Sequence, residues 1–192
     1  MIPTPTTSLT PVPTPPGRAQ WVFEPGDWIE SSPTVVDGTV FVGSYDDNLY
    51  AVDAETGSQQ WAFETDDGVG SSPTVVDDTV FVGSDDTNLY AVDIETGSQQ
   101  WAFETDAEIR SSPTVVSGTV FVGSYDTNLY AVDAETGSQE WAFKTDAEVR
   151  SSPTVAGGTV FVGSLDGDLH AVDIETGSQQ WAFETDAEIR SS

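Results

Sequence analysis

The chain has 192 residues, with 33 acidic and five basic side chains and a formal net charge of −28. This balance excludes nucleic acid and anionic membrane surfaces as expected partners, because both are bound by clustered cations. The sequence has no cysteine, which excludes disulfides, thiolate chemistry and Cys-based metal sites. It also has no apolar run long enough for membrane insertion and no visible secretory signal.

The first segment, residues 1–20, differs in composition from the rest of the chain. Residues 1–17 hold six Pro and five Thr and no charged residue. This composition predicts a disordered, extended linker or stalk. Stalks of this kind hold secreted domains away from a surface, which favours an extracellular or cell-surface location. The alternative is a disordered tail without a function.

From residue 21 the sequence repeats every 40 residues without an insertion. The repeats are 21–60, 61–100, 101–140 and 141–180, followed by a partial repeat at 181–192. A period of this size indicates an array of one supersecondary unit stacked on copies of itself. Aromatic and β-branched residues recur in fixed register, which argues against disorder despite the charge.

Four short strands are expected in each repeat. In the second repeat they are residues 72–76, 79–84, 88–93 and 99–104, separated by turn residues. The second and third strands are apolar at successive positions, so both of their faces are expected to be buried. The sequence therefore predicts an all-β, β-propeller-type array of about four blades, each with four antiparallel strands.

One eleven-residue stretch, AVDAETGSQQW at Ala51 to Trp61, recurs at 91–101, 131–141 and 171–181 in the pattern AVDxETGSQxW. It resembles the tryptophan-docking motif of the pyrroloquinoline-quinone-like (PQQ-like) propeller repeat family. The resemblance implies that each indole packs between adjacent blades and that the Asp and Gly shape the turn before it. The residues assigned to this structural docking are Trp61, Trp101, Trp141, Trp181, Asp53, Asp93, Asp133, Asp173, Gly57, Gly97, Gly137 and Gly177.

Members of that family range from quinone-dependent alcohol dehydrogenases to non-enzymatic outer-membrane-assembly scaffolds, both commonly eight-bladed. The dehydrogenase site has an adjacent cysteine pair and a calcium cage, and this sequence has no cysteine. We therefore expect a non-catalytic scaffold for protein or ligand interaction, with no catalytic residues and no quinone or calcium cofactor. The alternatives are a part or remnant of a quinone-dependent dehydrogenase, or a multisite small-ligand or glycan binder.

The acidic surface favours a protein from a salt-rich environment. At about 1 M salt the Debye length falls to roughly 3 Å, which quenches repulsion between carboxylates. We therefore predict loss of structure in dilute buffer. An acidic calcium-binding surface is the competing interpretation.

Arginines gather at one position of the repeat, just before the Ser-Ser-Pro sequence. In a propeller this position is expected at the mouth of the central channel. Guanidinium groups there, beside serine hydroxyls, form a candidate site for an anion or a partner's carboxylate. The candidate binding residues are Arg110, Arg150, Arg190, Ser111 and Ser151. The alternative is local pairing with Glu108, Glu148 and Glu188, which would only relieve repulsion.

No metal site is predicted. Aspartates in the turns, such as Asp46-Asp47-Asn48 and Asp166-Gly167-Asp168, offer the oxygen donors that calcium prefers. They lack the spacing of a calcium loop, and Asp, Asn and Gly are ordinary turn residues. His170 replaces a tyrosine found at 50, 90 and 130, and a packing role is expected for it.

Strand counting leaves the closure of the array open. The sequence holds five Trp-bearing strands but four copies of the other three. Four blades could close alone, two chains could pair as halves of an eight-bladed ring, or the array could stay open. A protein partner or a second copy of the chain is therefore expected.

Overall fold

The computed structural model describes residues 20–185 and 187–189. The predicted linker or stalk and Arg190 thus lie outside the described residues, apart from residue 20. The described part of the chain forms sixteen strands in four separate sheets, and each sheet has four strands in chain order. All strand pairs are antiparallel, so the predicted all-β array of four-stranded blades is confirmed.

Each blade corresponds to one sheet. Blade 1 has β1 (Thr34–Val36), β2 (Thr39–Ser44), β3 (Asn48–Asp53) and β4 (Gln59–Glu64); blade 2 has β5 (Thr74–Val76), β6 (Thr79–Gly83), β7 (Asn88–Asp93) and β8 (Gln99–Glu104). Blade 3 has β9 (Thr114–Val116), β10 (Thr119–Gly123), β11 (Asn128–Asp133) and β12 (Gln139–Lys144); blade 4 has β13 (Thr154–Ala156), β14 (Thr159–Gly163), β15 (Asp168–Asp173) and β16 (Gln179–Glu184).

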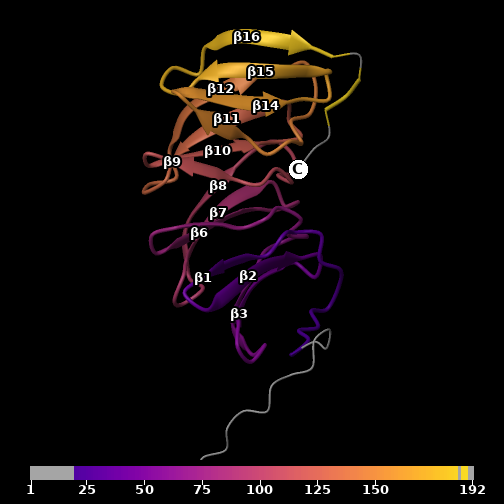
Figure 1. The fold of residues 1–192 in the computed structure, drawn as a ribbon, viewed down its shortest axis with the longest axis vertical. Coiled ribbons are helices and arrows are strands. Elements are labelled where there is room, and N and C mark those ends of the chain that lie inside the picture. Colours follow the sequence, from indigo (N-terminus) through magenta and orange to yellow (C-terminus); the bar gives the residue numbers. More distant parts are fainter. Residues whose placement is uncertain (1–19, 186, 190–192) are drawn as a thin grey trace, which may run out of the picture.

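The blades stack along the longest axis of the molecule, with blade 1 at one end and blade 4 at the other (Figure 1). The inner strands β1, β5, β9 and β13 lie next to one another in that order. The first strand of blade 2 begins two residues later than the sequence predicts. Ser72 and Pro73 instead bridge neighbouring blades, because the amide of Ser72 donates to Ser112 Oγ and the carbonyl of Pro73 accepts from Thr34.

Both faces of each blade carry apolar side chains, because side chains alternate between faces along a strand. In blade 2 the pairing register places Phe81 opposite Ala91 and Ala91 opposite Trp101. We call this the indole face; it holds Phe81, Leu89, Ala91 and Trp101. The opposite face, the valine face, holds Val80, Val82, Tyr90 and Val92.

The core lies between the blades. The indole face of each blade packs against the valine face of the next, which produces one apolar cluster per interface. In the middle of the array Leu89, Val82 and Val92 are fully buried, so the prediction that β6 and β7 are buried on both sides is confirmed. Within the described residues, no helix has the length and hydropathy needed to cross a bilayer.

Candidate functional site

The tryptophans of the repeat sit at the junctions between blades. The indole Nε1 of Trp61 donates to the carbonyl of Ile94 in the next blade, at 3.0 Å. Trp101 and Trp141 make the same bond to Ala134 and Ile174, also at 3.0 Å. Each buried indole thus has its polar atom satisfied by the neighbouring blade.

A glycine in the next blade makes room for each indole. A Cβ built on Gly137 would lie 2.8 Å from Cδ2 of Trp101, and Gly137 has a φ of 70°. Both the close approach and the left-handed backbone favour glycine at this position. Gly97 and Gly177 take the same place under Trp61 and Trp141. We call this carbonyl and glycine together an indole seat.

The Asp that recurs in each turn shapes the indole seat. In blade 1, Asp53 Oδ1 accepts hydrogen bonds of 2.7 Å from both the amide and the hydroxyl of Thr56. These bonds hold the pKa of Asp53 below its usual value, and the bond from the hydroxyl contributes most to this shift. The same contacts recur at Asp93, Asp133 and Asp173. These carboxylates therefore act as turn formers.

Trp181 differs from the other docking tryptophans in its exposure. Like them it packs on a phenylalanine of its own blade, here Phe161, with ring centroids 5.8 Å apart. Its side chain is 46% exposed, whereas Trp61 and Trp101 are each 9% exposed. Phe183, on the same strand, is 62% exposed. The last strand of blade 4 thus presents an apolar surface to solvent.

The arginines form a ladder with tyrosines on one side of the array. Arg110 donates two hydrogen bonds to Asp85, from Nε at 2.9 Å and from a terminal nitrogen at 2.8 Å. Its guanidinium also lies 5.8 Å from the ring centre of Tyr45 and 5.6 Å from that of Tyr125. Tyr45, Asp85 and Tyr125 belong to blades 1, 2 and 3, so Arg110 connects three successive blades.

Arg150 continues this ladder. Its guanidinium lies 4.3 Å from the ring centre of Tyr125, and Nε donates to Glu148 at 2.7 Å. At the other end, the hydroxyl of Tyr45 donates to Glu30 at 3.0 Å. Burial and this hydrogen bond raise the pKa of Tyr45 to about 12. The structure therefore brings Arg110 and Arg150 together through Tyr125, and both arginines already pair with carboxylates of their own chain.

The serines of the candidate binding site lie inside the fold. Ser111 and Ser151 are 0% and 6% exposed, and each accepts a hydrogen bond from a glycine amide, at 3.1 Å from Gly123 and 2.8 Å from Gly163. Both hydroxyls hold the backbone, and Ser151 also lines a groove beside Phe161. Their assignment as binding residues stays a prediction. The sequence analysis did not find the tyrosines of the ladder. The signal that could have revealed them is the variation at their position in the repeat, which reads Tyr45, Asp85, Tyr125 and Leu165.

The acidic turns are internally bonded. Asp46, Asp86 and Asp126 each accept a hydrogen bond from a tyrosine hydroxyl four residues later, at 2.7–2.8 Å. Burial, followed by the bond to Asp46, raises the pKa of Tyr50 to about 12. Burial alone would raise the pKa of Asp46, but hydrogen bonds from Tyr50 and Gly26 outweigh it and lower that pKa.

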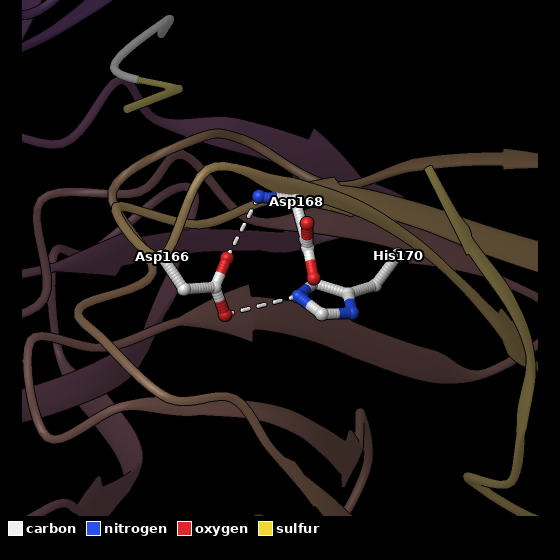
Figure 2. A group of neighbouring side chains, drawn as sticks. All are labelled: Asp166, Asp168 and His170. Atoms are coloured by element: carbon white, nitrogen blue, oxygen red, sulfur yellow. Dashed lines mark hydrogen bonds and ion pairs between the residues drawn. The ribbon is translucent and has the colours of Figure 1, made fainter. Parts of the chain in front are cut away.

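Blade 4 replaces the tyrosine with histidine and gathers a potential metal-ligand set. Asp166, Asp168 and His170 each place one ligand atom within 4.8 Å of the others. His170 Nε2 lies 3.2 Å from Asp166 Oδ2, and its Nδ1 points away from both aspartates (Figure 2). That Nδ1 is buried and has no hydrogen-bond partner among the described residues. The Asp166 contact takes the place of the tyrosine–aspartate contact of the other blades.

Grooves lie beside several of the blades. One, of about 420 Å³, has a mixed polar and apolar lining from blades 2 and 3 that includes Phe81, Gln100 and Asp133. Another, of about 190 Å³, is lined by apolar side chains at the valine face of blade 1, among them Trp21, Phe23 and Ile29.

Comparison with known protein families identifies the family of these blades. The family described as "Beta-alanine-activating enzyme, beta-propeller" matches residues 8–192. The chain belongs to this propeller family. No curated protein matches the sequence.

Solved structures share the fold of this propeller chain. BamB from Moraxella catarrhalis is 24% identical with a TM-score of 0.76, and the match covers 86% of this chain and 52% of BamB. The computationally designed Ika8 protein is 17% identical with a TM-score of 0.75, covering 83% of this chain and 50% of Ika8. Quinohemoprotein alcohol dehydrogenase from Comamonas testosteroni is 20% identical with a TM-score of 0.71, covering 84% and 35%.

These likenesses show the fold alone, since all three identities are below 25%. The chain spans about half the length of BamB and Ika8 and about a third of the dehydrogenase.

Proposed function

We propose that this chain is a non-catalytic propeller scaffold that joins protein modules through blade-to-blade docking. The observation that carries the proposal is the exposed indole face of blade 4. Residues Ala171 to Ser192 are identical in sequence to Ala91 to Ser112, which include the Trp-bearing strand that blade 2 packs against blade 3. A surface built for docking inside the array is thus also presented at its end.

The polar side chains repeated in the blades support this proposal. The Asp of each turn holds a threonine, the buried serines hold glycine amides, and Arg110 connects three blades. These groups stabilise the architecture of the described blades. The metal-free and cofactor-free state is part of the proposal.

The runner-up function, a part of a quinone-dependent dehydrogenase, gives the direct test. The chain would be incubated with pyrroloquinoline quinone and Ca²⁺, and dye reduction would be followed with a series of primary alcohols. We expect no more dye reduction than in the same mixture without protein. Alcohol-dependent turnover that follows the protein concentration would overturn the scaffold proposal.

A second alternative, a multisite small-ligand or glycan binder, is favoured by the groove of about 420 Å³ between blades 2 and 3. Calorimetric titration with neutral oligosaccharides would distinguish it from the scaffold. Because the interfaces repeat, a binder of this kind would take up several ligands per chain. We expect no binding.

We also propose that the acidic surface adapts the chain to concentrated salt. Asp47 supports this, because burial and the charges of neighbouring carboxylates, Asp67 first, raise its pKa. Dialysis from concentrated KCl into dilute buffer is expected to abolish the far-ultraviolet circular dichroism of the sheets. A spectrum that does not change would contradict this adaptation.

A further inference from the structure

The two end blades carry the same two kinds of face that meet at each internal interface. Inside the chain, the indole face of blade 2 meets the valine face of blade 3, and Val120, Val122 and Val132 of that face are fully buried. Blade 1 carries the same residues at the same register, namely Val40, Val42, Tyr50 and Val52. The complement that this surface requires is therefore known from within the molecule.

Blade 4 exposes the matching indole face. Phe81 and Leu89 of blade 2 are 2% and 0% exposed, whereas Phe161 and Leu169, their counterparts in blade 4, are both partly exposed. A groove of about 350 Å³ follows this face and is lined by Phe161, Leu169 and Ile189, among others. The same side chains that are buried inside the array are thus left uncovered at its end.

Residues 21–28 cover the valine face of blade 1. Trp21 Nε1 donates to the carbonyl of Ala54 at 3.0 Å, and its indole lies against Gly57, so Trp21 occupies the indole seat of this blade. Phe23 packs edge-on against Tyr50 with ring centroids 5.0 Å apart, as Phe63 does against Tyr90 at 5.1 Å. We call residues 21–28 the cap segment.

The cap segment covers this face only in part. Val40 is partly exposed, whereas Val80 and Val120, its counterparts in blades 2 and 3, are fully buried. Ile29, which follows the cap segment, is 43% exposed, and the equivalent Val69 and Ile109 are fully buried. The cap supplies one short segment where a neighbouring blade would supply a whole face.

The cap segment is also held less firmly than the strand that would replace it. Residues 21–24 belong to no strand in the described structure. By contrast, β16 pairs with β15 along its length, from Asp168 with Glu184 to Val172 with Gln179. Removing the cap breaks isolated hydrogen bonds, such as those from Trp21 Nε1 to Ala54 and from the Tyr45 amide to the Trp28 carbonyl, but no strand ladder. Removing β16 would break a full ladder.

We propose that the chain associates head to tail with a second copy of itself, and that Trp181 of one copy displaces Trp21 from the indole seat of blade 1 in the next. In the complex, the indole face of blade 4 covers the valine face of blade 1, as blade 2 covers blade 3. The exchange replaces each cap contact with its equivalent and adds the burial of Phe161 and Leu169. This inference rests on the proposed scaffold function and names the partner as a second copy.

The test is the molar mass of the full chain, measured by light scattering over a dilution series at about 1 M KCl, where repulsion is screened to roughly 3 Å. Three substitutions are compared with the parent: Trp181→Ala, Trp21→Ala, and Gln99→Ala as a control. Gln99 is an exposed residue on β8 of blade 2, a blade that contributes to neither of the two end faces. Circular dichroism confirms that each variant is folded.

The two tryptophan substitutions are expected to act in opposite directions. Trp181→Ala should weaken association by a factor of about 100 or more, the scale of emptying a tryptophan site. Trp21→Ala should strengthen association because it removes the competitor from the seat, and Gln99→Ala should leave association unchanged. A general loss of stability cannot produce this opposition of sign.

The proposal is overturned if neither the parent nor Trp21→Ala exceeds the mass of one chain at any concentration. It is also overturned if Trp181→Ala associates as well as the parent, or if Trp21→Ala weakens association. The last result would mean that Trp21 itself bridges the two copies. None of these outcomes produces alcohol oxidation, so they are separate from a failure of the scaffold proposal.

Discussion

Replacing Trp101 with alanine tests the energetic role of the indole seats. Trp101 is 9% exposed, donates to Ala134 at 3.0 Å and packs on Phe81 with ring centroids 5.8 Å apart. Its removal leaves a cavity between blades 2 and 3 and an unpartnered carbonyl at Ala134. Emptying a buried tryptophan site costs about 3 to 5 kcal/mol, and we expect a loss of unfolding free energy in this range.

The chain provides its own control for this experiment. Trp181 stands in an identical sequence but is 46% exposed. Trp181→Ala should cost less than about 1.5 kcal/mol, because most of its contacts are with its own blade. Both variants would be unfolded with urea in concentrated KCl and followed by circular dichroism, at a dilution where light scattering reports a single chain.

The comparison can refute the reasoning in a direct way. If the two substitutions lower the free energy of unfolding by the same amount, local sequence and not the inter-blade contact determines the contribution of the indole. A loss below about 1 kcal/mol at Trp101 would show that its site collapses without cost or is not buried in solution.

Two further predictions concern the glycines and the tyrosines. Gly118→Ala, at a φ of 85° with no atom within 4 Å of the new Cβ, should cost about 1 to 2 kcal/mol from backbone strain alone. Gly137→Ala has a similar φ but meets the indole of Trp101 at 2.8 Å, so it should cost about 1 to 3 kcal/mol more in urea unfolding; equal costs would argue against the seat. For Tyr45 and Tyr50, the folded pKa of about 12 exceeds the unfolded value of about 10, so their contribution is complete below pH 10 and is lost between pH 10 and 12. Tyrosinate absorbance should show this late ionisation, and Tyr50→Phe should reduce it; ionisation near pH 10 in the folded chain would contradict the burial of these hydroxyls.

Much of the fold follows from local pattern. The strands of blade 2 begin and end within two residues of the sequence-based prediction, because turn residues and apolar runs alternate at short range. The burial of both strand faces was also predictable, since TVFV and LYAV leave no polar face. The start of β5 was not, because Ser72 and Pro73 form contacts with other blades, 39 and 40 residues away in the sequence.

The candidate site depended far more on tertiary structure. Sequence reasoning found Arg110 and Arg150 from their shared position, and it weighed local pairing with glutamates as the alternative. It did not find that Arg110 also lies between Tyr45 and Tyr125, in blades 1 and 3. It also placed Ser111 and Ser151 at a channel mouth. In the structure both serines are buried, and their hydroxyl oxygens accept hydrogen bonds from glycine amides.

The sequence by itself determined the repeat, the four-stranded unit and the apolar character of both blade faces, because these depend on residue type and on spacing within 40 residues. Only the tertiary structure decided which of two identical segments is buried. Trp101 and Trp181 have the same neighbours in sequence, but the first meets a following blade and the second meets solvent. Burial depends on what stands across an interface, and no pattern within one strand records that.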